Sequence, residues 1–232
     1  MRVSRIDFDE RKQETRGYFD FLKKLNENAS RLHATPNGQQ PIPFPIADGL
    51  VKTLKATAFL LLYNLVESTM TDALHDIYDE LKNQSVSFTE ITDDLKKIVL
   101  SNFKSLSMDN LPAQLVDISV DIITVGFRPR ELFSGNIDAR LIRKTAQDYG
   151  FSHETPSQST KQGEFLLMVK TNRNDLAHGA KSFAEVGKEY SIEQLMETEA
   201  EVVSYLAGIL DNIERYIQNE EYLETSYRTR NT

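Results

Sequence analysis

The chain has 232 residues, of which 40% are hydrophobic and 27% are charged, and it contains no cysteine. This composition excludes collagen-like and low-complexity chains. The absence of cysteine excludes disulfide scaffolds, thiolate metal sites and thiol nucleophiles. A formal net charge of −8 argues against a general electrostatic attraction to nucleic acid, so any RNA contact has to come from a local basic patch.

The N-terminal segment, MRVSRIDFDERKQE, is charged and lacks the apolar core of a signal peptide. The most apolar run extends from Ala56 to Val66, well short of the roughly 20 residues that a membrane-spanning helix needs. We therefore expect a soluble, cytoplasmic protein that makes no contact with a membrane.

Hydrophobic residues recur at helical spacing along almost the whole chain, and no segment alternates convincingly as a strand. Prolines cluster between Pro36 and Pro45, which predicts a partly extended loop after a first amphipathic helix. Ser191 and Gln194 form a capping box that opens the last helix. The predicted helices span residues 6–31, 48–82, 92–106, 111–125, 138–149, 164–178 and 191–220.

The second of these helices is apolar on nearly all sides between Ala58 and Val66, which is typical of a buried central helix. No internal repeat and no linker divides the chain into two cores. We therefore predict an all-α fold, a single helical bundle with long central helices over residues 1–220. A polar C-terminal tail is expected over residues 221–232.

Only one histidine lies in a pattern that indicates chemistry. The chain has no HExxH pair, no Gly-rich phosphate loop and no GxSxG turn. His178 ends a predicted helix in the string TNRNDLAHG and lies four residues after Asn174, on the same helix face. Lys170 extends this stripe, whereas Arg173 points about 140° away from His178 on an ideal helix.

Spacing alone leaves two interpretations of this segment open. In the structural one, the segment is an ordinary helix end, where Arg173 pairs with a carboxylate and His178 favours the helix dipole. In the functional one, both side chains act on one small target. Because one straight helix cannot easily aim both residues at such a target, a homodimer would have to bring two copies of the segment together.

The spacing Arg173-Asn174-x-x-x-His178 resembles the R-x4-6-H motif of the HEPN superfamily, all-helical domains that include many metal-independent ribonucleases. The longer string over residues 173–187, RNDLAHGAKSFAEVG, is similar to the MAE-like HEPN branch of bacterial conflict and defence systems. Residues 61–68 and 133–151 look like segments of the same domains. The resemblance spans most of the chain and implies a HEPN-like domain that cleaves RNA as a dimer.

The resemblance also implies a mechanism and roles. The ribose 2′-hydroxyl would attack the adjacent phosphate, leaving a 2′,3′-cyclic phosphate and a 5′-hydroxyl. His178 would be the general acid or base, and Arg173 would bind the scissile phosphate. Asn174 would orient His178 or contact RNA. We expect no cofactor and no metal. Some HEPN toxins are neutralised by adenylylation of a tyrosine two residues after the histidine, but Ala180 stands there, so this route cannot apply.

A second candidate lies in the apolar central helix. Asn64 and Glu67 are its polar exceptions between Ala58 and Glu67, and they share a stripe with Leu60 and Thr71. A buried polar group needs a partner, so this stripe is expected to face the Arg–His helix. Glu67 would then pair with Arg173 or assist catalysis. A structural salt bridge or a dimer contact would explain the same pattern.

A basic segment around residues 128–144 is the candidate for RNA binding, together with Lys170. It carries two carboxylates against five cations, which gives +3, and the cations are Arg128, Arg130, Arg140, Arg143 and Lys144. These side chains would track RNA phosphates along a local rim. An ordinary solvated charged surface is the alternative interpretation.

Three functions therefore stay open. The first is a HEPN-type endoribonuclease acting as a bacterial toxin or defence effector, restrained by an antitoxin or companion protein encoded nearby. A second is a catalytically inactive HEPN-like module for interaction or dimerisation in a larger complex. The third is an unrelated helical regulator with a fortuitous Arg–His pair. We expect the first, because Arg173, Asn174 and His178 are all present.

Overall fold

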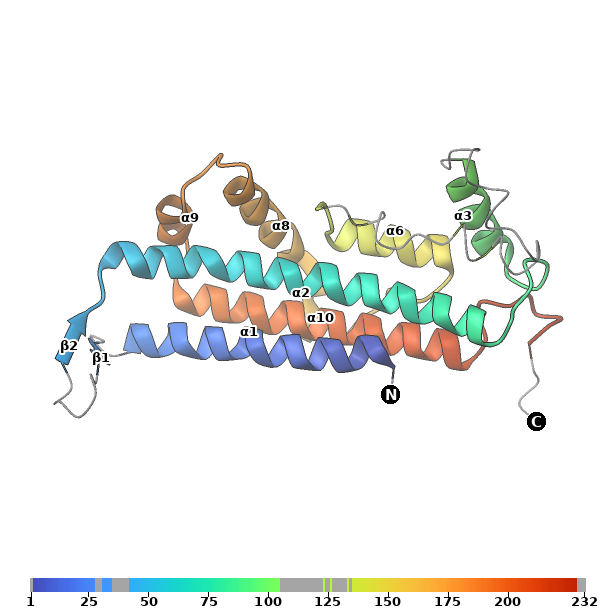
Figure 1. The fold of residues 1–232 in the computed structure, drawn as a ribbon, viewed down its shortest axis with the longest axis horizontal. Helices are drawn as coiled ribbons and strands as arrows, with labels where there is room; N and C mark the ends of the chain where they lie inside the picture. Colours follow the sequence, from blue (N-terminus) through green and yellow to red (C-terminus); the bar gives the residue numbers. More distant parts are fainter. Residues whose placement is uncertain are drawn as a thin grey trace.

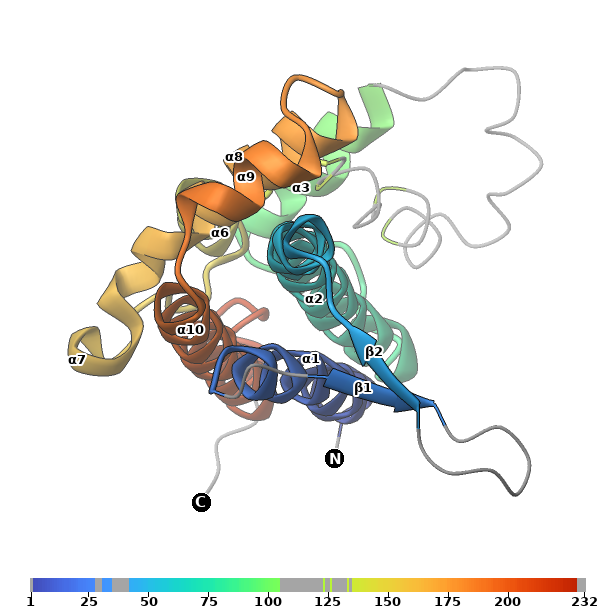
Figure 2. The ribbon, with the colours of Figure 1, turned by 90° about the vertical axis from the view of Figure 1, so that its left-hand side faces the viewer.

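The computed structural model describes residues 2–27, 31–34, 42–104, 123, 126, 133 and 135–228. These residues are overwhelmingly helical, which confirms the predicted all-α fold (Figures 1 and 2). The described elements are α1 (Val3–Glu27), β1 (Arg31–Ala34), β2 (Ile42–Pro45), α2 (Asp48–Asn83), α3 (Asp93–Lys104), α6 (Ala139–Tyr149), α7 (Ser157–Thr160), the 3-10 turn η2 (Lys161–Gly163), α8 (Glu164–Ala177), α9 (Phe183–Glu189) and α10 (Ile192–Gln218).

Three long helices form the body of the molecule. α1, α2 and α10 run side by side, and the shorter helices α3, α6, α8 and α9 lie over one side of this bundle (Figures 1 and 2). The buried residues of α10 recur at helical spacing, from Leu195 through Val202 and Ile209 to Ile217. That stripe lets α10 pack on α1 and α2, and α10 also contacts α7, η2 and α8.

α2 is the central helix and runs unbroken from Asp48 to Asn83. It contacts α1, α8, α9 and α10, which explains why it is apolar on so many sides. By length and composition alone α2 could cross a membrane, with a mean hydropathy of 1.3 over the relevant window. The core helix of a soluble protein passes the same test, and the contacts of α2 with four other helices fit a core position.

Local capping signals explain several helix ends. The Asp138 side chain accepts a hydrogen bond from the Leu141 amide at 3.0 Å and begins α6, and Gly150, with φ of +89°, ends it. The predicted capping box of Ser191 and Gln194 is present at the start of α10. The sequence predicted the bounds of α6 and α10 within one or two residues, and it did the same for α2, α3 and α8.

Five short elements differ from the expectations. The proline-rich loop contains a small antiparallel pair, β1 with β2, in which Arg31 lies opposite Pro45. The stretch after Phe151, expected as polar loop, includes α7 and η2. α9 was not expected either, although Ser182 and Glu185 form a second capping box at its start. The predicted helix over 111–125 lies outside the described residues, apart from Ile123.

The beginning of the expected polar tail packs against the body. Tyr222 and Leu223 are buried, and Leu223 forms an isolated bridge with Ile91. The Thr92 amide donates to the carbonyl of Tyr222 at 2.9 Å, and the Glu224 amide donates to the carbonyl of Glu90 at 2.8 Å. Burial of these two large side chains therefore carries the folded part of the chain past residue 220.

Candidate active site

α8 brings the Arg–His segment to the edge of the bundle. One face of this helix is buried against its neighbours through Leu166, Val169 and Leu176. The polar residues of the other face are therefore left at the surface. His178 is the residue that caps the C-terminal end of α8, its amide donates to the carbonyl of Asn174 at 2.9 Å, and its side chain is exposed.

Arg173 lies in a partly buried position and has no counter-ion among the residues that the structure describes. Its guanidinium lies over the ring of Tyr63 on α2, 4.5 Å from the centroid. The Nη1 atom donates to the side-chain oxygen of Asn174 at 3.0 Å and to the carbonyl of Gly135 at 3.5 Å. Within the described part of the chain, Arg173 forms no ion pair with a carboxylate. The positive charge is thus held by a ring face and two neutral oxygens.

Glu67 approaches this arrangement through the backbone of Gly135. Its Oε1 atom accepts a hydrogen bond from the Gly135 amide at 3.0 Å (bridging α2 and the segment before α6). No direct ion pair joins Glu67 to Arg173 among the described residues, so the expected pairing is not what the structure contains. Gly135 lies between the two side chains. Its amide donates a hydrogen bond to Glu67, and its carbonyl accepts one from Arg173.

Lys170 is one helical turn before Arg173 and has a different environment. It forms an ion pair with Asp138, the residue that caps α6. Burial raises the pKa of the Asp138 carboxyl, but the hydrogen bonds from Lys170 and from the Leu141 amide outweigh it and hold that pKa below its usual value. The charge of Lys170, which we expected to contact RNA, is therefore already matched.

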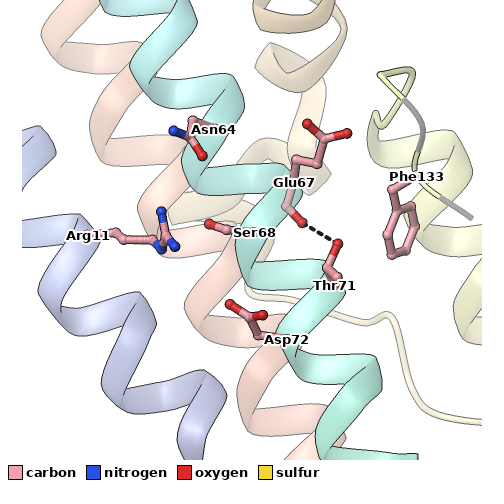
Figure 3. A pocket seen from close by; sticks show the side chains of 7 residues that line it. All are labelled: Arg11, Asn64, Glu67, Ser68, Thr71, Asp72 and Phe133. Atoms are coloured by element: carbon pink, nitrogen blue, oxygen red, sulfur yellow. Dashed lines mark hydrogen bonds between the residues drawn. The ribbon is translucent and has the colours of Figure 1, made fainter. Parts of the chain in front are cut away.

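A shallow, open pocket of about 310 Å³ adjoins Glu67 and lies over α2 between Arg11 of α1 and Phe133 (Figure 3). Its lining consists of Asn64, Glu67, Ser68, Thr71 and Asp72 of α2, with Arg11 of α1 and Phe133. Burial, with a further contribution from Asp7, raises the pKa of Asp72. Asn64 is exposed in this pocket, whereas Glu67 of the same polar stripe contacts Gly135.

A family model of MAE-like HEPN domains matches residues 3–222, which include every described helix. This chain belongs to the MAE-like HEPN family. No curated protein and no solved structure matches it.

In this HEPN domain the two residues of the motif face different surroundings. Arg173 is directed at Tyr63 and Gly135, whereas the exposed imidazole of His178 has no hydrogen-bond partner in the described chain. The two side chains make no hydrogen bond to each other there. That agrees with their separation on the helical wheel. A single copy therefore presents the arginine and the histidine separately.

The predicted RNA-binding rim is only partly available in the HEPN domain. Arg128 and Arg130 lie outside the described residues. Lys144 forms an ion pair with Asp148, and Arg143 donates to the carbonyl of Gln162 at 3.2 Å, next to the start of α8 and far along that helix from His178. Arg140 is exposed, with no ion pair to another described residue.

Sequence reasoning missed Tyr63, Gly135, Asn136 and Asp138 as residues of the site. The Asn136 side-chain oxygen accepts from Asn174 at 3.4 Å, and the hydroxyl of Tyr63 accepts from the Ile137 amide at 3.1 Å. A Gly-Asn pair before an Asp N-cap is a recognisable turn signal. Nothing local, however, indicates that this turn packs against Arg173. Among the described residues, no cluster of three or more His, Asp and Glu side chains could hold a metal ion.

Proposed function

We propose that this HEPN domain is a metal-independent endoribonuclease that cleaves RNA by attack of a 2′-hydroxyl on the adjacent phosphate. The environment of Arg173 is the observation that carries the proposal. A partly buried guanidinium that has no carboxylate partner within the described ranges retains an unmatched charge there, and such a position favours a bound anion. Phosphate is the anion that the planar guanidinium fork binds best.

The second reacting group is His178. Its exposed imidazole lacks a partner in the described chain, so it is available to exchange protons with RNA. As the 2′-oxygen forms its bond to phosphorus, a histidine acting as base takes the 2′-hydroxyl proton. As the bond from phosphorus to the 5′-oxygen breaks, an acid returns a proton to that oxygen. Arg173 stabilises the charge that develops on the phosphoryl oxygens.

A homodimer completes this site. Because Arg173 and His178 of one copy do not meet, the proposed chemistry requires the arginine of one copy and the histidine of its partner. The exposed stripe of α8 that bears Thr171 and His178 offers a surface for that contact. Asn174, bonded to both Arg173 and Asn136, ties the arginine to this stripe.

The biological setting that we propose is a bacterial toxin or defence effector in the cytoplasm, restrained by a companion protein encoded nearby. Membership of the HEPN family supports this setting. Induced expression should slow growth when the protein is wild type, and Arg173→Ala and His178→Ala should relieve the effect. Equal growth inhibition by all three proteins at matched levels would indicate another cause.

The chemistry is tested with a defined RNA oligonucleotide in excess EDTA. Cleavage should persist and leave a cyclic phosphate, detected by mass spectrometry, and a single 2′-deoxy substitution at the cut should block it. His178→Ala should lose about 10²–10⁴-fold in rate, the usual scale for a general acid–base group. Arg173→Lys should also lose most activity, since lysine keeps the charge but lacks the fork.

A control variant and a contrary outcome complete this test. Lys188→Ala, an exposed cation on the neighbouring α9, should cleave like wild type. Loss of cleavage in EDTA, or equal cutting of the 2′-deoxy substrate, would contradict the mechanism.

An inactive HEPN-like interaction module is the second candidate. The matched charges of Lys170 and Lys144 favour it, because these two predicted RNA-binding cations already have carboxylate partners. Under this alternative the wild-type protein should leave RNA intact, and Arg173→Lys should change neither RNA binding nor growth.

A further inference from the structure

Residues 135–138 form a turn between α2 and α8, which we call the site turn, and each of its residues contacts one of these helices. The Gly135 amide donates to Glu67, and the Ile137 amide donates to the hydroxyl of Tyr63. On the other side, the Asn136 side chain accepts from Asn174, and Asp138 pairs with Lys170. The site turn thus connects two side chains of α2 with three of α8, counting the contact of Gly135 with Arg173.

Gly135 is required here for two reasons. Its φ of +76° lies in the left-handed region, which is unfavourable for residues with a side chain. A Cβ atom at this position would lie 3.3 Å from Nη1 of Arg173 and 3.7 Å from its Nη2. Glycine therefore favours this approach of the backbone carbonyl to the guanidinium, whereas a larger residue would strain the turn and crowd Arg173.

Tyr63 supports both the turn and the guanidinium. Its side chain is buried, with the residue 2% exposed, so the ring cannot move without disturbing the core. The ring face lies beneath Arg173, and the hydroxyl at its far end accepts from the Ile137 amide. Burial raises the pKa of Tyr63, which keeps the hydroxyl protonated at neutral pH. A neutral aromatic face attracts a guanidinium without cancelling its charge.

These contacts use only one end of the guanidinium. Both hydrogen bonds recorded for Arg173 come from Nη1. Nε and Nη2 donate to no group in the described part of the chain. These two nitrogens form one edge of the planar fork, and such an edge binds two oxygens of a phosphate at once.

We propose that the site turn, Tyr63 and Glu67 position Arg173 so that its Nε and Nη2 edge receives the scissile phosphate. The inference rests on the proposed function and assigns Glu67 a positioning role. Glu67 holds the Gly135 amide, the Gly135 carbonyl holds Nη1, and Tyr63 fixes the plane of the fork. Glu67 therefore takes no proton in the reaction.

Two substitutions of Glu67 distinguish positioning from proton transfer. In Glu67→Gln the amide oxygen still accepts from Gly135, so cleavage and its pH profile should stay close to wild type. Glu67→Ala leaves the Gly135 amide without its acceptor and should lower kcat by roughly 10–100-fold, the scale expected for a small misplacement of a reacting group. Gly135→Ala should lose at least as much, because its side chain meets the guanidinium.

A glutamate with the same local role elsewhere provides the matched control. The Ser87 amide donates to Oε2 of Glu90 at 2.6 Å, in a turn after α2 that lies outside the proposed site. Glu90→Ala removes the same kind of hydrogen bond, and we expect it to cleave RNA like wild type. The melting temperature of every variant is measured alongside, so that loss of folding is not mistaken for loss of positioning.

A second readout follows Arg173 directly and needs no RNA. The side-chain Nε–H signal of Arg173, assigned by its absence in Arg173→Lys, should show slow guanidinium rotation in wild type and in Glu67→Gln. Faster rotation is expected in Glu67→Ala. The inference is overturned if Glu67→Ala leaves both this signal and cleavage at wild-type values, or if Glu67→Gln fails as fully as Glu67→Ala. Failure of the proposed function would look different, because intact RNA with wild-type protein would leave the Arg173 signal responding as predicted.

Discussion

Two cations of α8, Lys170 and Arg173, differ in role because their side chains have different partners. Lys170 and Arg173 are three positions apart on α8, yet Lys170 is matched by Asp138 and Arg173 lies on a neutral ring. The sequence identified both as site candidates. It could not assign their partners, because Tyr63, Gly135 and Asp138 reach α8 only through tertiary packing.

Glu201 is a buried acid in the core that supports α8 from α10. The residue is 4% exposed, and its Oε1 accepts from the Phe165 amide at 3.4 Å, whereas Oε2 lacks a hydrogen-bond partner in the described structure. Burial raises the pKa of Glu201 to about 7, with Glu164 and Glu197 adding to the rise and Lys161 opposing it. The folded state therefore binds this proton more tightly than the unfolded state does.

The raised pKa of Glu201 predicts how the free energy of unfolding depends on pH. A raised folded-state pKa contributes stability below the unfolded value near 4.5, and that contribution is lost as pH rises through about 7. Glu201→Gln should remove the loss, stabilising the protein by about 2 kcal/mol at pH 8 and by much less at pH 5. Thermal melts at the two pH values measure it. An equal effect at both would show that Glu201 does not titrate in this range.

At the scale of the elements, helices with local capping signals could be predicted from the sequence, and short elements set by packing could not. The ends of α6 and α10 depend on Asp138, Gly150 and Ser191, which act within one turn of chain. α9 is only seven residues long, and its Gly187 argues against a helix by propensity. Its position follows from α2, since a Cβ on Gly187 would lie 1.9 Å from the carbonyl oxygen of Lys52.

The close approach of α9 to α2 predicts a large effect of one methyl group. Gly187→Ala should force the two backbones apart and destabilise the protein by about 1–3 kcal/mol, measured by chemical denaturation. Gly17→Ala is the matched control, because no described atom lies within 4 Å of a Cβ at that position in α1. It should be neutral or stabilise by up to about 1 kcal/mol. If both variants lost similar stability, the close contact between α9 and α2 at Gly187 would not be the cause.

At the scale of the whole molecule, the site was also predictable from the sequence only in part. The sequence indicated which α8 residues are candidates for the proposed chemistry and that one helix presents them in different directions. It gave no information on the site turn, whose contacts join residues of α2, α6 and α8 that are far apart along the chain. The sequence predicted that Glu67 lies near Arg173. A helical wheel cannot show that the Gly135 backbone lies between them.

The proposed homodimer makes a prediction about mixed variants. Light scattering should give about twice the 26.5 kDa of one chain. Arg173→Lys and His178→Ala should each be inactive alone, but mixing them should restore on the order of a quarter of the wild-type rate. In a two-fold symmetric dimer, mixed pairs keep one site with both native residues. A monomer that cleaves RNA, or a mixture that stays inactive although subunits exchange, would refute a site shared in this way.

The packing of α10 has a consequence for how a cell makes this protein. α10 follows α1, α2 and α8 along the chain, and it packs on α1 and α2 while Leu223 pairs with Ile91. The apolar faces of α1 and α2 therefore stay partly uncovered until α10 has been synthesised. Exposed core surfaces of this kind favour aggregation or chaperone binding. α8 is synthesised before α10, and it packs mainly on α2 with a smaller contact to α10. A nascent chain thus carries Arg173 and His178 before α10 completes the packing of α1 and α2, so the proposed nuclease activity requires α10 to have been synthesised.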